Sequence, residues 1–338
     1  MAWGRVLAFA DPLPCAAALQ SAAQAEILPT GRGRFEVEAT QIEIEKLRMQ
    51  HFAVALPQVT TVVASPDRKA IGFLTEANAS TLLHCGLEVL PNNILIYGCD
   101  VLHQRSSNDL RYGTMSMPAQ DFPVLCKTIM GREFLAEPRT ALVRPDPALM
   151  TRLMKTHKVV AQLAHDTPDI LQQEEVGRAL EAQLIHIMVR CLAEGAGIET
   201  TTGDLRHHAI VKRFEDFLAA YTDRPLYLTD ICAGIGVAER TLRAACEAHL
   251  GMGPIRFLAL RRMHLVRQAL LHADSSKITV TRIVTDHGFW ELGRFSVAYR
   301  ALFGERPSET LRRPAEHVVI NLNRPSSLSA TELSGFAN

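Results

Sequence analysis

The sequence lacks most features that would assign it to a chemical class. It has no Gly-rich phosphate loop, no G-x-S-x-G nucleophile elbow and no H-E-x-x-H helix, so the common catalytic motifs are missing. No apolar run approaches the roughly 20 residues of a membrane-spanning helix, and the first residues do not read as a signal peptide. We therefore expect a cytoplasmic protein that is not an enzyme and has no membrane partner.

The cysteines form no recognisable framework. Their number is odd and none are spaced as C-x-x-C, so neither a disulfide set nor a cysteine-based metal site is indicated. Reduced thiols, mostly in the core, explain this usage. The seven are Cys15, Cys85, Cys99, Cys126, Cys191, Cys232 and Cys246.

A net charge of zero argues against a nucleic-acid-binding protein when the chain is taken as a whole. The average hides a split, because residues 206–313 hold 17 Lys/Arg and 11 Asp/Glu, a net of +6. The rest of the chain holds 19 against 25, a net of −6. Such asymmetry predicts one basic module that faces DNA and a second part that does not.

The basic part contains an internal repeat. Residues 231–254 and 283–307 each read as a short helix, a glycine-bearing turn and a second helix that ends in Gly-x-x-Pro. The second copy has one extra residue between its turn glycine and its second helix. Each copy predicts a helix-turn-helix, in which the second helix enters the major groove of DNA.

Residues 206–313 resemble the DNA-binding domain of the AraC/XylS family of bacterial transcription regulators. The most family-specific part is the stretch from Gly288 to Glu309. The sequence departs from the family at Ala238, where a capping Ser is usual, and at Cys232 and Val284, where Ala is usual. The resemblance implies a transcription regulator that acts on promoter DNA with RNA polymerase, and most resembles activators of catabolic operons.

The recognition helices are predicted near 238–250 and 291–303. On the first, Leu242 and Cys246 face inward, and on the second Phe295 and Tyr299 do. Arg240 and Arg243 are the best candidates for DNA contacts, because arginine matches guanine or grips phosphate. The predicted DNA-binding residues are Glu239, Arg240, Thr241, Arg243, Ala244, Glu247, Leu292, Gly293, Arg294, Val297 and Arg300.

Between the copies, residues 254–273 predict a helix of ~30 Å, close to the ~34 Å between neighbouring major-groove faces. Its arginines Arg261, Arg262 and Arg267 contact phosphates or pair with acidic groups, and the sequence does not decide between these. Trp290, like Trp3, is expected in the core.

The predicted fold class is α+β, with a β-rich, cupin-like N-terminal barrel and helices, followed by an all-α domain with two helix-turn-helix units joined by a long helix. Short β-type runs separated by turns fill residues 35–117, and residues 11–25 read as an Ala-rich helix. The expected organisation is a sensor domain at 1–146, a helical dimerisation or packing segment at 147–195, a linker at 196–205, the DNA-binding domain at 206–313 and a mobile tail at 314–338.

The function of the first domain is less determined. His84, Glu88 and His103 could start a metal site, but they lack the cupin ligand spacing, so neither metal nor cofactor is predicted. A barrel mouth lined by Tyr, His and Arg would suit a small polar or anionic effector, whose identity is unknown. The alternative class is a DNA-directed enzyme such as an alkyl-transfer repair protein, which needs an activated Cys, and Cys15 has no basic neighbour.

The helical segment 147–195 also has two interpretations. The apolar stripe Leu180, Leu184, Ile187, Met188 and Cys191 forms the contact of a homodimer, or it completes the core beneath the barrel. We favour the dimer contact.

Overall fold

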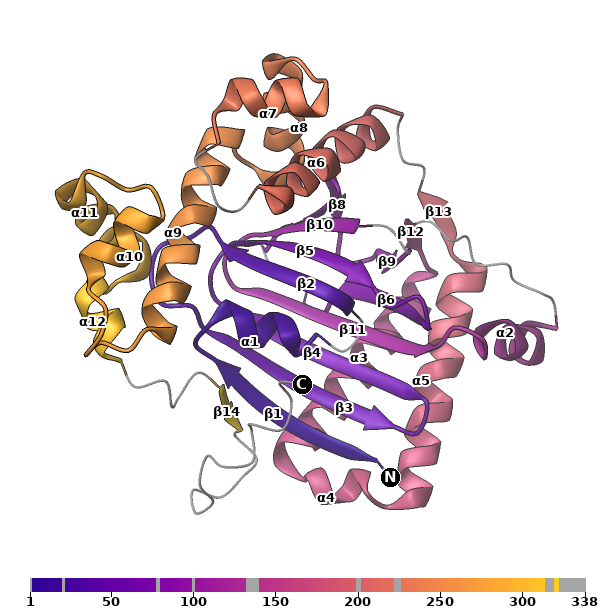
Figure 1. Ribbon diagram of the computed structural model, residues 1–338. Coiled ribbons are helices and arrows are strands. Elements are labelled where there is room, and N and C mark those ends of the chain that lie inside the picture. The colour runs from indigo at the N-terminus through magenta and orange to yellow at the C-terminus, as the bar shows by residue number, and fades with distance from the viewer. Residues whose placement is uncertain are drawn as a thin grey trace.

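The computed structural model describes residues 2–19, 22–76, 80–98, 101–131, 140–198, 202–221, 226–313 and 319–321 (Figure 1). A β-rich domain with its own helices comes first and an all-helical domain follows, which confirms the α+β fold class. Cys99 lies outside the described residues. No helix among the described residues combines the length and apolar character needed to cross a bilayer.

The β-rich domain is built from two antiparallel sheets. The larger has nine strands in the order β13-β12-β9-β6-β11-β4-β3-β1-β14. Its strands are β1 (Trp3–Phe9), β3 (Val37–Ile44), β4 (Leu47–Val54), β6 (Arg68–Leu74), β9 (Ile94–Ile96), β11 (Leu110–Pro118), β12 (Ala141–Arg144), β13 (Ala196–Ile198) and β14 (Val319–Asn321). The smaller has the order β2-β5-β10-β7-β8. Its strands are β2 (Ala22–Pro29), β5 (Gln58–Ala64), β7 (Leu82–His84), β8 (Leu87–Val89) and β10 (Val101–Ser106).

Both faces of the larger sheet are buried, and the sequence alternates accordingly. In β9, Ile94 and Ile96 pack on the helical side, whereas Leu95 between them packs toward the smaller sheet. The helices on the first side are α2 (Phe122–Met130), α3 (Pro147–Asp166), α4 (Pro168–Leu171) and α5 (Glu174–Glu194). Because period-2 alternation sends side chains to opposite faces, one strand can serve two apolar cores.

The predicted dimerisation stripe lies inside this helical core. Leu184, Ile187, Met188 and Cys191 are fully buried with the apolar side chains of the larger sheet, and Leu180 packs on the same cluster. The favoured prediction of a dimer contact was therefore wrong for this stripe, and the alternative, a packing role within the chain, is confirmed.

The N-terminal expectations need two further corrections. Helix α1 covers only Pro12–Ala17, with Asp11 as its N-cap, and Ala22–Pro29 is strand β2. Pairing of β2 with β5 outweighs the helical preference of its alanines. The expected linker contains a strand, Ala196–Ile198, which pairs with β12.

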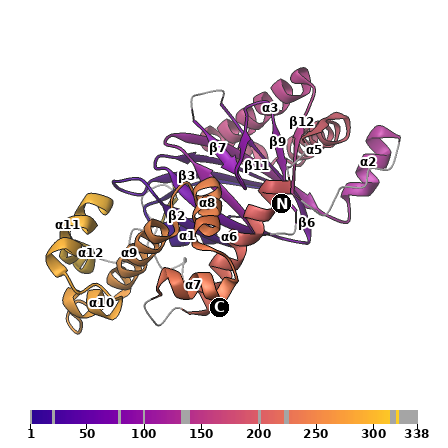
Figure 2. The same cartoon turned by 90° about the horizontal axis from the view of Figure 1, so that it is seen from above.

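The helical domain contains α6 (Thr202–Ala220), α7 (Leu228–Ile235), α8 (Glu239–Leu250), α9 (Pro254–His272), α10 (Val280–Asp286), α11 (Leu292–Phe303) and α12 (Pro307–Arg312). It has two apolar cores, one around α6, α7 and α8 and one around α10 and α11, and α9 contributes to both. Figure 2 shows α9 running from the α7–α8 unit to the α10–α12 unit.

The first of these cores continues into the β-rich domain. Leu28 of β2 and Val59 of β5 pack in the same cluster as Val211 and Phe214 of α6. The smaller sheet is therefore covered on its outer face by the helical domain. Residues 319–321 return to the β-rich domain as β14 and pair with β1, so the expectation of a mobile tail does not hold for them.

Candidate DNA-binding surface

Each copy of the sequence repeat forms a helix-turn-helix. Helix α7 ends at Gly236, whose φ of 65° is left-handed, and α8 begins at Glu239. Helix α10 is followed by Gly288, with φ of 77°, and α11 begins at Leu292. The extra residue of the second copy thus lies in its turn, as predicted.

The recognition helices bury one face and expose the other. In α8 the buried side chains include Leu242, Cys246 and Leu250, and in α11 they are Phe295, Tyr299 and Phe303. These aromatic rings pack on one another, with Tyr299 and Phe303 centroids 4.5 Å apart. The helix period then leaves the remaining positions for the surface.

Every predicted DNA-binding position is on the outer side of its helix. Thr241 is half-buried, and the rest are exposed: Glu239, Arg240, Arg243, Ala244, Glu247, Leu292, Gly293, Arg294, Val297 and Arg300. Two of the arginines pair within their own helical region, Arg243 with Glu239 at 2.7 Å and Arg294 with Glu291 at 2.8 Å. Exposed pairs of this kind contribute little to stability, so DNA can compete for both arginines.

The second unit also presents apolar side chains to solvent. Trp290 is 76% exposed and Val297 is 73% exposed. The expectation that Trp290 lies in the core was wrong, because the extra turn residue places it just before α11 and outside the Phe289–Phe295 contact. Trp3 is half-buried and carries Arg5 over its ring at 4.9 Å.

The three departures at the helix-turn-helix are accommodated. Ala238 offers no side-chain cap to α8, whereas Thr279 caps α10 through its hydroxyl. Cys232 is half-buried, and Val284 is fully buried in the second core. The bulk of Val284 is therefore used in packing.

Two of the arginines of the connector α9 contact the β-rich domain. Arg267 is buried, 3.1 Å from Asp11 at the start of α1 and 3.6 Å from Glu305. Arg261 lies 3.4 Å from Glu26 of β2, and Arg262 lies over the Phe289 ring. The open alternative is resolved for Arg261 and Arg267, which pair with acidic groups in this arrangement of the domains.

A cavity of about 60 Å³ lies between the two sheets. Its polar end is a buried cluster in which Tyr97 and Tyr112 hydroxyls are 2.8 Å apart and Gln104 donates to Tyr97 at 3.0 Å. Burial raises the pKa of both tyrosines. The predicted tyrosines are present, but the described lining is otherwise mostly apolar and includes no His or Arg.

The structure does not bring together His84, Glu88 and His103, the three residues considered as the start of a metal site. His84 is buried and Glu88 is exposed on β8. His103 instead meets Cys85, His208 and His249, a group that sequence reasoning missed. Cys15 is no nucleophile, because burial, aided by Asp11, raises the pKa of its thiol to about 12.

Known proteins show similarity to the helical domain. Residues 231–313 match the model of a family described as "Helix-turn-helix domain". A probable thc operon regulatory protein of Rhodococcus erythropolis is 38% identical over 103 residues, which cover 30% of this chain and 31% of that protein. XylDLEGF operon transcriptional activator 2 of Pseudomonas putida is 31% identical over 100 residues, 30% of this chain and 64% of that protein.

Two solved structures are similar over more of the chain. The AraC-like transcriptional activator CuxR is 13% identical with a TM-score of 0.41, covering 85% of this chain and 100% of that one. ToxT of Vibrio cholerae is 11% identical with a TM-score of 0.30, covering 92% of this chain and 96% of that one. The chain thus spans about a third of the Rhodococcus relative and 64% of the Pseudomonas relative. Residues 231–313 are therefore a helix-turn-helix domain, and over about 100 residues the chain is similar to these operon regulators.

Proposed function

We propose that the protein regulates transcription by reading two adjacent major-groove segments of a promoter, one with α8 and one with α11. The observation that carries the proposal is the pair of outward faces on helices joined by the 19-residue α9. That helix is about as long as one turn of DNA, so both faces can meet one side of a duplex. The +6 charge of residues 206–313 supports the contact with phosphates.

Activation of a catabolic operon, with RNA polymerase as a partner, extends this proposal. It is supported by the similarity to the Pseudomonas relatives, which are operon transcriptional activators. Footprinting of the full chain on DNA upstream of its own and neighbouring genes tests the proposal. We expect two protected stretches one helical turn apart and loss of both with non-promoter DNA, whereas uniform weak protection would contradict sequence-specific binding.

We further infer that a small effector binds in the cavity between the sheets. Gln58 lines this cavity, and its buried Oε1 has no hydrogen-bond partner. Buried acceptors are normally paired, so this atom suits a ligand that donates one hydrogen bond and is otherwise apolar. The cavity exceeds the roughly 10–15 Å³ that one water molecule needs.

The response to the effector would act through the contacts between the two domains. The domains carry opposite net charge, and Arg267 joins Asp11 of the first domain to Glu305 of the second. An effector changes this equilibrium only if it binds one arrangement of the domains better than the other.

A thermal-shift panel of small metabolites tests the site. A true effector raises the melting temperature of the wild type and changes its promoter affinity, and Gln58→Leu abolishes both effects. The matched control is Gln162→Leu on the exposed side of α3. A ligand that stabilises Gln58→Leu as strongly as the wild type would place the effector elsewhere.

A further inference from the structure

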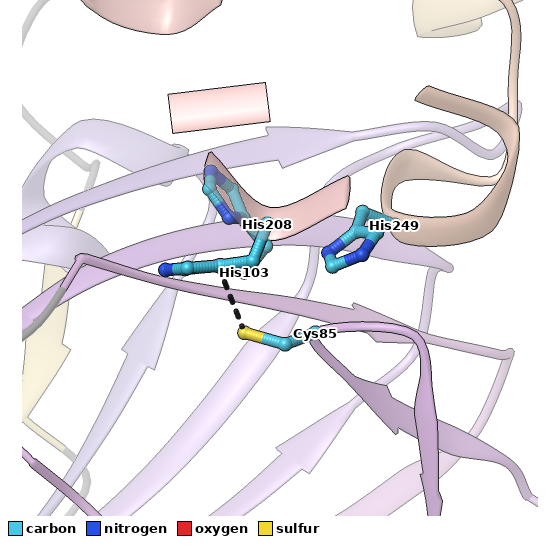
Figure 3. A group of neighbouring side chains, drawn as sticks. All are labelled: Cys85, His103, His208 and His249. Carbon is cyan, nitrogen blue, oxygen red and sulfur yellow. Dashed lines mark hydrogen bonds between the residues drawn. The ribbon is translucent and has the colours of Figure 1, made fainter. Parts of the chain in front are cut away.

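Four side chains with metal-binding atoms converge where the two domains meet. Cys85 comes from the turn between β7 and β8 and His103 from β10, while His208 comes from α6 and His249 from α8. Their ligand atoms all lie within 4.8 Å of one another, and Cys85 Sγ is 3.5 Å from His208 Nδ1. Figure 3 shows the three imidazoles gathered around the sulfur.

This spacing is close to that of a tetrahedral zinc site. With Zn–S near 2.3 Å and Zn–N near 2.0–2.1 Å, the ligand atoms of such a site are roughly 3.3–3.6 Å apart. The Cys85–His208 distance already has this value. The other ligand atoms, at up to 4.8 Å from one another, would each need to move by about an ångström to reach it.

The histidines have nitrogens that the protein leaves unpaired. His103 is 0% exposed and His249 is 1% exposed, yet His103 Nδ1 and both ring nitrogens of His249 have no hydrogen-bond partner. Leaving a buried polar atom unpaired costs about 1–3 kcal/mol. A ligand bound in the cluster would remove this cost.

His103 is oriented as a metal-binding histidine is. Its Nε2 donates to Glu215 Oε2 at 2.6 Å, which leaves Nδ1 as the ring nitrogen that faces the cluster. Glu215 is itself fixed, since Thr61 donates to its other oxygen at 3.2 Å. A carboxylate on the far nitrogen is the usual outer support of a metal-bound imidazole.

The position of Cys85 is also unusual. Cys85 and Gly86 form the two-residue turn of the β7–β8 hairpin, and both have positive φ, 48° and 85°. Such turns favour Asn or Asp followed by Gly, because a bulkier first residue is strained. A strained non-glycine residue is more common where its side chain has a function.

The ligand set selects the class of metal. One thiolate and three imidazoles suit zinc, whereas Mg²⁺ and Ca²⁺ require oxygen ligands. Four protein ligands fill a tetrahedral shell, so the site has a structural role and no open position for catalysis.

We propose that Cys85, His103, His208 and His249 bind one zinc ion, which fastens the DNA-binding domain to the β-rich domain. This departs from the sequence-based prediction of no metal. Two ligands come from each domain, so the ion acts as a cross-link. Because His249 lies in the last turn of α8, the link also fixes the first recognition helix.

Metal content of the full-length protein tests binding. After equilibration with zinc and removal of excess, the wild type should retain one zinc per chain, and Cys85→Ser and His249→Ala should retain less than a tenth of that. Cys232→Ser and His207→Ala, the latter beside His208 on α6, are the matched controls and should retain one. Retention of zinc by Cys85→Ser, or none by the wild type, would overturn the proposal.

Two further measurements remain decisive if a variant folds poorly. Glu215→Gln should weaken zinc affinity about 10- to 100-fold in a chelator competition, as for other outer-shell partners. Cobalt bound in place of zinc should show a thiolate-to-metal absorption band that Cys85→Ser lacks. Unchanged affinity in Glu215→Gln, or a cobalt spectrum without the thiolate band, would refute the ligand set.

The cross-link itself is tested by hydrogen exchange. Zinc should slow exchange in α6, α8 and the β7–β10 region of the wild type relative to the chelated protein, with no change in α11. Equal exchange in both states would show that the ion does not hold the domains together. None of these measurements of metal binding and hydrogen exchange involves DNA, so their outcomes are independent of the proposed function.

Discussion

At the scale of single residues, four arginines of the DNA-binding domain divide into two kinds. Arg261 and Arg267 form ion pairs with acidic residues of the β-rich domain. The side chain of Arg243 is about half exposed and that of Arg294 is mostly exposed, and each pairs with a neighbouring glutamate on the same surface. The exposed kind is available to DNA.

Replacing Arg243 with Ala should weaken binding to the specific site by about 1–3 kcal/mol, the usual value of a two-pronged arginine–guanine contact. Fluorescence anisotropy with specific and random duplexes measures the effect. Arg178→Ala is the control, because Arg178 makes the same kind of pair with Glu174 on α5, in the β-rich domain. Equal loss on both duplexes would assign Arg243 to phosphate, and no loss on either would remove it from the interface.

His264 makes the contact between α9 and β2 sensitive to pH. Burial lowers its pKa to about 4, against the opposing effect of the Pro29 carbonyl, to which Nε2 donates at 2.9 Å. A histidine near 6.5 when unfolded then takes up a proton on unfolding below that pH. Above pH 6.5, His264 therefore does not change the free energy of unfolding. As the pH falls from 6.5 toward 4, His264 lowers the free energy of unfolding more and more.

We expect the free energy of unfolding to fall between pH 7 and pH 5 by about 2 kcal/mol more in the wild type than in His264→Gln, which keeps an N–H donor but does not titrate. Denaturant titrations at the two pH values give the difference. Parallel pH dependence in the two proteins would show that the pKa of His264 is not lowered in the folded protein.

At the scale of elements, α5 belongs to the interior. Leu184 is fully buried in the core that the larger sheet shares with α2 to α5. Leu184→Ala should therefore cost about 2–5 kcal/mol through the cavity it leaves. Val159→Ala on α3, where the side chain is 49% exposed, should cost far less. Denaturation curves and light scattering distinguish this outcome from a change in mass at unchanged stability, which a dimer contact would give.

The accuracy of the sequence-based expectations follows how local each element is. The helix-turn-helix units were predicted closely, because turn glycines and inward-facing residues lie within one short segment. β2 was missed, since its alanines favour a helix and only pairing with β5 makes it a strand. The Cys85–His249 cluster leaves no pattern in the sequence, because its members are brought together by docking of two domains.

At the scale of the whole molecule, the DNA-binding domain is joined to the β-rich domain at both of its ends. The domain follows β13, which is the strand at one edge of the larger sheet. After the domain, the chain forms β14, which pairs with β1 and is the strand at the opposite edge (Figure 1). Seen this way, the domain is an insertion between two strands of one sheet rather than an appendage.

Because the sheet holds the chain on both sides of the domain, we expect the movement of this domain relative to the β-rich domain to be restricted. Removing residues 314–338 should leave the domain with a single connection to the sheet. We expect the range of distances between the domain and the β-rich domain to widen. We expect double electron–electron resonance between spin labels on α5 and α12 to show a broader distribution in the truncated protein, with the β-rich domain still folded. An unchanged distribution would mean that β14 adds no restraint. With β14 in place, we expect the two recognition helices, whose mutual spacing α9 sets, to take a narrower range of positions relative to the β-rich domain.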